Sequence, residues 1–471
     1  MESQNKRIIR ALVLMCFLFL SIVVYLTYFE LFQKDKILTS SYNKRQWGEE
    51  DTTLRGSILD KNGVVLAYSE NNGEKNKRIY PFGTLYSQLI GYNSSVYGKS
   101  LLEAQYNHEL LNVREFGPIL DLQQKLAGEQ TVGNNLYLTL DHKLQTKAKK
   151  LLGSRNGAIV VMRPKTGEIL AMVSKPDFNP SSEKLEQRWE ELIESENHPF
   201  VPRATQGLYV PGSTFKVLIA AAAVESGISD KTFEDEGSIV IEGKTINNSG
   251  NHAYGKVDLK NALAVSSNVA FAQLGVELGD YKLKDMMARA GMNKNIDFDI
   301  PVSSSRFPYK EMSKLDLAAV GMGQGKLQVT PLHMAMIASG IANNGVIMKP
   351  YVVDRVVSAS GNTLKTVKPA VFSKMMTPET AAAVKDMMQY VVEKGTGKSA
   401  SVKGIEIAGK TGTAENELSM KQKNKEHAWF ICFAPADDPQ VAIAVVLEYS
   451  GSTGGKAAAP IARDLIRQVL Q

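Results

Sequence analysis

A proline-glycine turn followed by an apolar helix is predicted by the stretch Tyr209-Val210-Pro211-Gly212-Ser213-Thr214-Phe215-Lys216 and the alanine-rich run that follows it to Val224. The turn places Ser213 in the first turn of this helix, which we expect to end near Gly227. Lys216 follows Ser213 by three residues, so the two side chains share one face of the helix, with Cβ atoms roughly 5–6 Å apart. An amine at this spacing can reach a hydroxyl.

This pair has the composition of an activated nucleophile. A serine hydroxyl is a weak nucleophile near neutral pH and needs a base beside it. A lysine can be that base only when burial or a nearby cation lowers its pKa enough to leave it neutral. The aliphatic run after Lys216 predicts such a dry setting, and the helix N-terminus adds a positive field at Ser213. Ser-x-x-Lys occurs at four places in the chain, but only Ser213 has a turn before it and an apolar helix after it.

Length and composition indicate a globular protein of two or three domains. The chain has 471 residues and a net charge of +6, which is modest for this length and does not indicate a nucleic-acid partner. It contains no Walker loop, no G-x-G-x-x-G after a strand and no Cys/His cluster with metal-ligand spacing. We therefore expect no cofactor and no metal.

The N-terminus predicts a single membrane anchor. The run from Ala11 to Phe29 carries no charge and is long enough to nearly span a hydrocarbon core of about 30 Å. Lys6, Arg7 and Arg10 precede it, which favours a cytoplasmic N-terminus. A cleaved signal peptide is the alternative, but bulky residues from Tyr25 onwards do not fit a cleavage site. We predict a cytoplasmic tail (1–10), an anchor in the cytoplasmic membrane (11–31) and an extracytoplasmic remainder.

Residues 32–152 are predicted to form a small non-catalytic domain of mixed structure, which we call the pedestal. Two apolar runs from Arg55 to Ala67 flank Asn62-Gly63, which is a β-hairpin signal. A helical pattern from 101 to 111, a strand from 136 to 140 and a helix capped by Asp141 follow. This part has no acid/base constellation, so a structural or partner-binding role is expected.

Residues 153–471 are predicted to form an α+β domain with an antiparallel sheet flanked by helices. Strands are expected at 158–162, 168–174, 238–242, 244–247, 405–415, 428–434 and 441–447. Helices are expected at 183–196, 261–278, from Thr330-Pro331, at 378–393 and at 458–470. The glycine-rich Gly321 to Gly325 lacks the Gly-Lys-Ser/Thr of a phosphate loop and is interpreted as a tight structural turn.

Two further polar motifs stand out in apolar surroundings. Ser266 and Asn268 interrupt the predicted helix at 261–278, and they are satisfied either by local backbone or by partners elsewhere in a site. Lys-Thr-Gly occurs at Lys165, where turn chemistry explains it, and at Lys410, inside a predicted strand. A strand glycine is costly unless something approaches the backbone closely, so Gly412 indicates a bound ligand.

Ser213-x-x-Lys216, Ser266-x-Asn268 and Lys410-Thr411-Gly412 match, in order, the three motifs of penicillin-binding proteins and serine β-lactamases. The second motif is Ser-Ser-Asn here. Over nearly its whole length the chain resembles a class B, monofunctional penicillin-binding protein. Supporting matches are Arg55-Gly56-x-Ile58-x-Asp60, Arg203-Ala204-x-Gln206-Gly207-x-Tyr209, Gly323-Gln324-Gly325-x-Leu327-x-Val329-Thr330-Pro331-Leu332 and Trp429-Phe430.

The resemblance implies a peptidoglycan D,D-transpeptidase that β-lactams acylate. Ser213 would attack the penultimate D-Ala carbonyl of a stem peptide, and Lys216 would take the serine proton. Ser266 would relay a proton to the leaving amine, with Lys410 nearby, and Asn268 would hold Lys216 and the substrate amide.

The resemblance also assigns the substrate-binding strand. Thr411 and Thr413 would hold the terminal carboxylate beside Gly412. The backbone N–H groups of Ser213 and Thr413 would form the oxyanion hole. An amine of a neighbouring stem peptide would then take the acyl group.

Two alternatives stay open. A β-lactamase would hydrolyse the same acyl-enzyme, but it needs a base aimed at water, and the sequence assigns none. A catalytically silent scaffold would recruit a wall polymerase, but the intact motifs argue against it. Because no transglycosylase domain is evident, a separate SEDS-type membrane glycosyltransferase is the expected partner.

Overall fold

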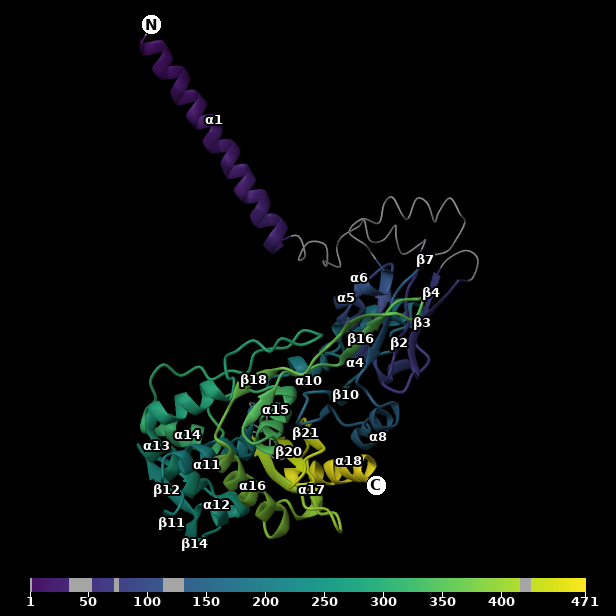
Figure 1. Ribbon diagram of the computed structural model, residues 1–471. Helices are drawn as coiled ribbons and strands as arrows, with labels where there is room; N and C mark the ends of the chain where they lie inside the picture. Colours follow the sequence, from purple (N-terminus) through teal and green to yellow (C-terminus); the bar gives the residue numbers. More distant parts are fainter. Residues whose placement is uncertain (1, 34–52, 72–75, 113–130, 416–424) are drawn as a thin grey trace.

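An antiparallel sheet forms the centre of the larger part of the molecule in the computed structural model, which describes residues 2–33, 53–71, 76–112, 131–415 and 425–471 (Figure 1). Among these residues the sheet has five strands, and their spatial order is β10 (Ile169–Lys175), β9 (Gly157–Met162), β21 (Val441–Leu447), β20 (His427–Ala434) and β19 (Ala408–Ala414). All five strands were predicted, although the last begins at Ala408 rather than at residue 405.

This sheet is buried on both faces. Along β9, Ala158, Val160 and Met162 belong to one hydrophobic cluster, and the alternate residues Ile159 and Val161 belong to another. The first cluster contains residues of α11 (Lys216–Glu225) and α15 (Pro331–Ala342), and the second contains residues of α8 (His142–Leu152) and α18 (Ala459–Leu470). Continuously apolar strands require cover on both sides, so the predicted α+β class is confirmed.

The helix boundaries follow the predicted caps closely. The Asp141 carboxylate accepts from the Leu144 N–H at the start of α8, and Thr330 caps α15 with Pro331 in the first turn. Other predicted helices are α9 (Ser182–Glu194) and α16 (Pro378–Glu393). The prediction of one helix at 261–278 is wrong, because the structure has α12 (Leu259–Val265) and α13 (Asn268–Arg289) with a break between them.

Two small hairpin-like sheets lie beside α12 and α13 (Figure 1). One pairs β11 (Thr232–Asp235) with β14 (Gly255–Asp258), and the other pairs β12 (Ser238–Ile241) with β13 (Lys244–Asn247). The second is the predicted pair of short strands around a turn. Next to them α14 (Lys314–Met322) packs on α13. Gly323 ends α14 in the left-handed conformation, which confirms the structural turn predicted there.

A second sheet organises the pedestal. Among the described residues it has six strands, in the order β17 (Thr363–Thr366), β16 (Val353–Val357), β8 (Asn135–Leu138), β2 (Ile58–Leu59), β3 (Val65–Asn71) and β4 (Asn76–Ile79). The hairpin predicted around Asn62-Gly63 is confirmed as β2–β3. Strands β16 and β17 enter this sheet from the segment between α15 and α16, so a single cut at residue 152 does not separate the two sheets.

A buried charged cluster ties the pedestal together. Glu103 of α5 (Leu101–Gln105) is fully buried and accepts from Arg55 at 2.6 Å and from Arg78 at 2.7 Å. The two arginines hold the pKa of the Glu103 carboxyl below its usual range despite its burial. Helix α6 (Asn107–Leu111) follows α5, so the helical pattern predicted from 101 to 111 is present as two short helices.

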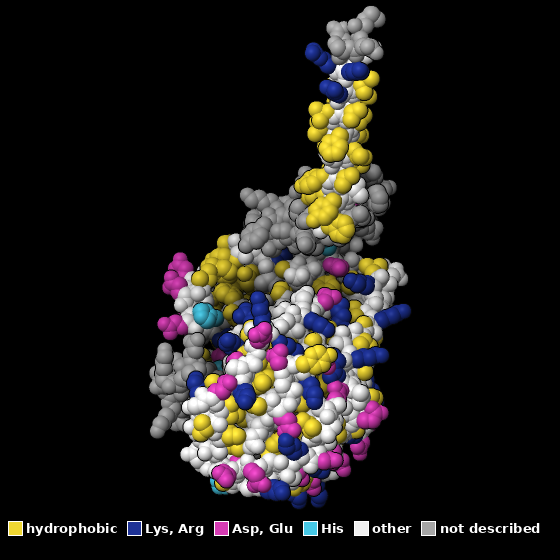
Figure 2. All heavy atoms as spheres, turned by 90° about the vertical axis from the view of Figure 1, so that its left-hand side faces the viewer, with side chains coloured by type: hydrophobic (Ala, Val, Ile, Leu, Met, Phe, Trp, Pro, Cys, Tyr) yellow, Lys and Arg dark blue, Asp and Glu magenta, His cyan; other side chains and the backbone are white. Residues whose placement is uncertain are grey.

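Helix α1 (Glu2–Tyr28) is long and apolar enough to cross a membrane. Its apolar side chains are exposed along the length of the helix. Figure 2 shows them, with basic side chains gathered near the N-terminal end. The stretch from Asn5 to Tyr28 has a mean hydropathy of 2.6 in its most apolar window. These properties fit the predicted single-pass anchor. Residues 34–52, at the start of the region predicted to form the pedestal, lie outside the described residues.

Candidate active site

Ser213 lies in a one-turn 3-10 helix, η3 (Gly212–Phe215), that continues directly into α11. Gly212 has φ 55°, and a Cβ atom there would lie 2.7 Å from the Thr413 carbonyl oxygen, so the turn requires glycine. Ser213 is half-buried, whereas Lys216 is fully buried at the start of α11. The turn therefore presents a partly exposed hydroxyl and a fully buried amine.

The Lys216 amine is held by one short segment. Its Nζ atom donates to the Ser266 carbonyl oxygen at 2.9 Å, to the Ser267 carbonyl oxygen at 3.1 Å and to Asn268 Oδ1 at 2.9 Å. It also lies 5.2 Å from the centre of the Phe271 ring. These contacts bring the first and second sequence motifs together.

The break between α12 and α13 makes those contacts possible. Ser266 adopts the left-handed conformation (φ 62°, ψ 39°), and Ser267 caps α13 by accepting from the Ala270 N–H. In a continuous helix the Ser266 and Ser267 carbonyls would bond within the helix; here both accept from Lys216. The sequence signal for this break was the serine pair itself, because serine competes with the helix backbone and favours N-caps.

Strand β19 brings the third motif to the same place. Lys410 is fully buried, and its Nζ atom donates to Ser266 Oγ at 3.0 Å and to the Thr411 carbonyl oxygen at 3.0 Å. The sequence left open whether Ser266 and Asn268 bond to local backbone or to partners elsewhere in a site. The second interpretation holds for Ser266 Oγ and Asn268 Oδ1, which accept from lysines of other elements. The three motifs thus converge on Ser266.

Gly412 allows the turn around Ser213 to touch strand β19. A Cβ atom at this position would lie 2.9 Å from Thr214 Cγ2, 3.0 Å from Trp429 Cβ and 3.2 Å from the Pro211 carbonyl oxygen. The sequence predicted a bound ligand as the close neighbour of this glycine, whereas its close neighbours in the structure are the protein's own turn around Ser213 and Trp429.

The two threonines of β19 differ in setting. Thr411 is buried, and its hydroxyl shares a hydrogen bond of 2.6 Å with the hydroxyl of Thr396. Thr413 is exposed. Sequence reasoning missed Thr396, although its flanking glycines, Gly395 and Gly397, marked a loop with unusual backbone freedom.

Burial dominates the electrostatics of the site. It lowers the pKa of Lys216 well below its usual range, the nearby Lys410 lowers it further, and Asp235 acts in the opposite direction. Burial also lowers the pKa of Lys410 to about 7. Two buried lysines close together cannot both hold a proton cheaply, which leaves a neutral amine available as a base.

Arg203 and Tyr209 both bind the carboxylate of Glu448. Arg203 Nε donates to Glu448 at 2.8 Å, and the Tyr209 hydroxyl donates to the same carboxylate oxygen at 2.6 Å. The bond joins the chain before the nucleophile turn to the end of β21. This explains in part why Arg203 and Tyr209 accompany the motif in the sequence.

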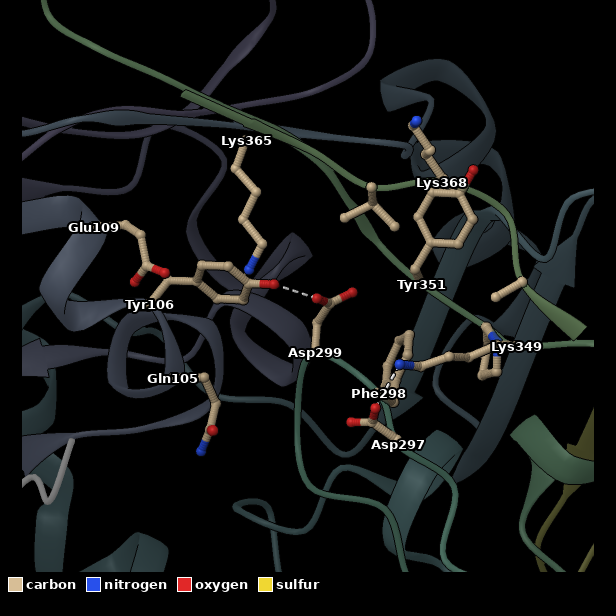
Figure 3. Close-up of a pocket in the computed structure, with 13 residues that line it drawn as sticks. Gln105, Tyr106, Glu109, Asp297, Phe298, Asp299, Lys349, Tyr351, Lys365 and Lys368 are labelled. Carbon is tan, nitrogen blue, oxygen red and sulfur yellow. Dashed lines mark hydrogen bonds and ion pairs between the residues drawn. The ribbon is translucent and has the colours of Figure 1, made fainter. Parts of the chain in front are cut away.

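A separate cavity of about 440 Å³ lies where the pedestal meets the segments around β16 and β18 (Val371–Lys374) (Figure 3). Tyr106 of the pedestal donates to Asp299 there, and Asp299 also accepts from the Val352 and Val353 N–H groups. None of the described residues that line it belongs to the three motifs. The cavity is thus a feature of the junction between the pedestal and the larger domain.

The doubly covered antiparallel sheet and the three motifs at its edge define the class of enzymes that contains transpeptidases and serine β-lactamases. The family model of the penicillin-binding protein transpeptidase domain matches residues 157–467, and that of the penicillin-binding protein A dimerisation domain matches residues 55–136. The chain belongs to the penicillin-binding protein transpeptidase family.

Named relatives extend this similarity to the whole chain. Peptidoglycan D,D-transpeptidase PbpA of Mycolicibacterium smegmatis is 32% identical, and the alignment covers 100% of this chain and 99% of that protein. Peptidoglycan D,D-transpeptidase MrdA of Acinetobacter baumannii is 30% identical over 81% of this chain and 64% of that protein.

Solved structures agree with the fold. Penicillin-binding protein A of Mycobacterium tuberculosis, as a ceftriaxone acyl-enzyme complex, superposes with a TM-score of 0.84 at 30% identity and covers 90% of this chain and 100% of that one. A D,D-transpeptidase domain from Eggerthella lenta superposes with a TM-score of 0.79 at 35% identity and covers 89% of this chain and 98% of that one.

Proposed function

We propose that this chain is a membrane-anchored peptidoglycan D,D-transpeptidase that cross-links stem peptides through an acyl-enzyme on Ser213. The observation that carries the proposal is the buried Lys216, which lies one helical turn from Ser213 and is held by the Ser266–Asn268 segment. The full-length similarity to PbpA, which is named for this activity, supports the same conclusion.

In the first step, neutral Lys216 takes the proton of Ser213, and the serine oxygen attacks the carbonyl carbon of the penultimate D-Ala. The peptide bond to the terminal D-Ala then breaks, and its nitrogen takes a proton through Ser266, which accepts from Lys410. D-Ala leaves and the stem peptide stays esterified to Ser213. In the second step, an amine of a neighbouring stem attacks the ester carbonyl and loses a proton through Ser266 to Lys410. The ester bond to Ser213 breaks, Lys216 returns its proton to the serine oxygen, and the new amide bond is the cross-link.

The tetrahedral oxyanion of each step is stabilised by the backbone N–H groups of Ser213 and Thr413. The contact of Gly212 with the Thr413 carbonyl, and the edge position of β19 in the sheet, support this assignment. In other acyl-transfer enzymes one such donor contributes about 3–4 kcal/mol. The loss of one such donor would slow the reaction by roughly 100- to 1,000-fold.

The substrate carboxylate binds at β19. The exposed Thr413 hydroxyl donates to it, and Thr411, oriented by Thr396, completes the site, with Lys410 adding positive charge. Asn268 donates its amide N–H to the Asn247 carbonyl at 2.9 Å and holds Lys216 with its oxygen. Its contact with the substrate amide completes the set of roles.

A fluorescent penicillin tests the nucleophile. We expect persistent labelling of the wild type and no labelling of Ser213→Ala, because the ester forms on that oxygen. Ser181→Ala is a matched control, since Ser181 also begins a Ser-x-x-Lys sequence at the start of a helix but lies at α9. Its labelling should equal that of the wild type. Mass spectrometry of Ser213 after incubation with a D-Ala-D-Ala donor extends the test to the natural substrate.

The same measurement separates the two alternatives. Rapid loss of label would indicate a β-lactamase, and absence of label on the wild type would indicate a silent scaffold. Asp235 and Glu448 are already engaged, Asp235 by Ser267 and Glu448 by Arg203 and Tyr209. This favours the transpeptidase, because hydrolysis needs a base free to activate water.

The domain borders and the topology belong to the same proposal. Residues 1–10 lie in the cytoplasm, 11–31 cross the membrane, 32–152 form the core of the pedestal and 153–471 carry the active site outside. The anchor and pedestal bind a SEDS-type membrane glycosyltransferase that supplies the glycan strands. Purification of the full chain from membranes tests this partner, and recovery without any such polymerase would contradict it.

A further inference from the structure

Asp235, the last residue of β11, is a fully buried carboxylate. Its four described hydrogen bonds come from neutral groups: Gly237 N–H at 2.9 Å, Ser267 Oγ at 2.5 Å and the Asn248 side-chain amide, which reaches both carboxylate oxygens at 2.7 and 2.9 Å. A buried charge held by neutral donors is costly, and it persists only where its hydrogen bonds are well satisfied. This cost suggests that the Asp235 carboxylate has a function.

Each of its two side-chain partners touches the segment that holds Lys216. The Ser267 hydroxyl, which donates to Asp235, also accepts from the Ala270 N–H, and the Ser267 carbonyl accepts from Lys216. Ser267 therefore links the carboxylate to the first turn of α13 and to the lysine.

Asn248 is the second link. Its Oδ1 atom accepts from the Asn268 N–H at 2.7 Å and from the Val269 N–H at 3.1 Å, while its amide is held by Asp235 and by the His252 carbonyl. The first amides of α13 thus bond to a residue whose orientation the carboxylate sets. Asn268 itself contacts Lys216.

The segment so held is one that would not keep its shape alone. Ser266 has φ 62°, a conformation that side chains other than glycine and asparagine seldom adopt, and it must stay there for its carbonyl to face Lys216. Residues in such conformations persist where the surroundings over-determine them. The bonds from Asp235 to Ser267 and Asn248 supply that determination.

We propose that Asp235 is a positioning residue of the transpeptidase, whose buried carboxylate, acting through Ser267 and Asn248, holds the Ser266–Asn268 segment in the conformation that binds Lys216. The inference rests on the proposed function. It adds a residue of strand β11 to the residues of the three motifs that form the site. The small sheets around α12 and α13 then help to position the catalytic residues.

The carboxylate also acts on Lys216 through its charge. The charged groups that act on this lysine are Lys410 of β19, which lowers its pKa, and Asp235 of β11, which raises it. Since Lys216 works as a base only when neutral, acylation rises with pH through its pKa. Removal of the Asp235 charge lowers that pKa, so the acid limb of the pH profile moves to lower pH.

The test compares Asp235→Asn with Glu234→Gln in the full chain in detergent. Glu234 is the adjacent residue of β11 and is exposed, so its replacement removes the same charge from the opposite face. The rate of acylation by a fluorescent penicillin is measured from about pH 5 to about pH 9, together with the melting temperature. We expect Asp235→Asn to be slower by roughly 10- to 100-fold with its acid limb at lower pH, and Glu234→Gln to match the wild type.

Ser267→Ala keeps the charge but removes the link. It should slow acylation while leaving the acid limb in place, and the double variant should be no slower than the slower single variant, because the bond between Ser267 and Asp235 is disrupted in each single variant. Wild-type rate and profile in Asp235→Asn, or losses that multiply in the double variant, would overturn the inference. If Asp235→Asn does not fold, Ser267→Ala decides: slow acylation supports it and a wild-type rate rejects it. Failure of the wild type to be labelled would instead reject the proposed function.

Discussion

Lys216 and Lys410 are both fully buried, which is rare for lysine and costly for a charged amine. Lys216 donates to oxygens of Ser266, Ser267 and Asn268, and Lys410 donates to Ser266 Oγ and to the Thr411 carbonyl. The acceptors fix where each nitrogen lies, and burial sets how readily it gives up its proton. The same burial that would prepare Lys216 as a base therefore reduces stability, a trade-off common in active sites.

Replacement of Lys410 by methionine exposes this cost. The folded pKa of Lys410 is about 7, whereas an unfolded lysine titrates near 10.4. Burial of the charged amine therefore lowers the stability of the wild type by its full amount below the folded pKa. This loss of stability disappears as the pH rises towards the pKa of the unfolded lysine. We expect the stability of Lys410→Met relative to wild type to be greater near pH 6 than near pH 9.5, by roughly 3 kcal/mol.

Thermal unfolding at the two pH values checks this prediction. Lys403→Met is the control, because Lys403 is exposed and its replacement should change stability equally at both. A pH-independent effect in Lys410→Met would mean that the buried amine does not titrate in this range.

At the scale of elements, the site is a meeting of one turn, one helix break and one strand. Helix α11 carries Lys216, the break between α12 and α13 supplies its acceptors, and β19 adds Lys410. Close approach depends on glycine, since Gly212 and Gly412 let the nucleophile turn and β19 touch. The distance between these elements therefore sets how the side chains of the three motifs are placed relative to one another.

Gly412→Ala should separate the turn from the strand. Its new Cβ atom would lie 2.9 Å from Thr214 Cγ2 and 3.0 Å from Trp429 Cβ, so the elements must shift apart. We expect a loss of about 1–3 kcal/mol in stability and acylation slower by about 100-fold. Stopped-flow measurement of penicillin labelling gives the rate.

Gly404→Ala provides the comparison. Gly404 has φ 80° but open space around it, so alanine there strains the backbone without touching the site. Its stability should fall while its acylation rate stays unchanged. Equal rates in the two variants would show that the contact at Gly412 does not position the nucleophile.

On the scale of the whole molecule, the pedestal and the larger domain share a sheet. The chain leaves the domain after α15 and returns before α16; between them β16 pairs with β8 on one side and with β17 on the other (Figure 1). The chain thus crosses between the two parts more than once. We infer that damage to the pedestal destabilises the catalytic part as well.

Glu103→Gln tests this coupling, because it leaves Arg55 and Arg78 buried without their carboxylate. Breaking a buried ion pair by removing one partner costs about 3–5 kcal/mol. We expect the temperature at which penicillin labelling is lost to fall together with the melting temperature. Glu70→Gln on β3, where the side chain is exposed, should change neither. Independent loss of the pedestal, with labelling retained, would contradict the shared-sheet account.

Local patterns were sufficient for most elements. Apolar runs located the strands of the central sheet, and Asp141, Thr330 and Pro331 marked helix starts that the structure confirms. The order of the three motifs was sufficient to predict the family. The helix predicted at 261–278 failed because an apolar run outweighed the capping preference of the serine pair, and the competing bonds come from residues far away in the chain.

The amino-acid sequence by itself determined the apolar N-terminal helix, most helices and strands and the chemical types in the site, because these depend on neighbours within a few positions along the chain. The order of the three motifs determined the family. Only the tertiary structure decided which groups meet. The burial of Lys410, the partnership of Thr396 with Thr411 and the links from Asp235 through Ser267 and Asn248 join residues from 13 to 144 positions apart. Hydrogen bonds and desolvation act through space, so a pattern along the chain records the donors and acceptors but not their pairing.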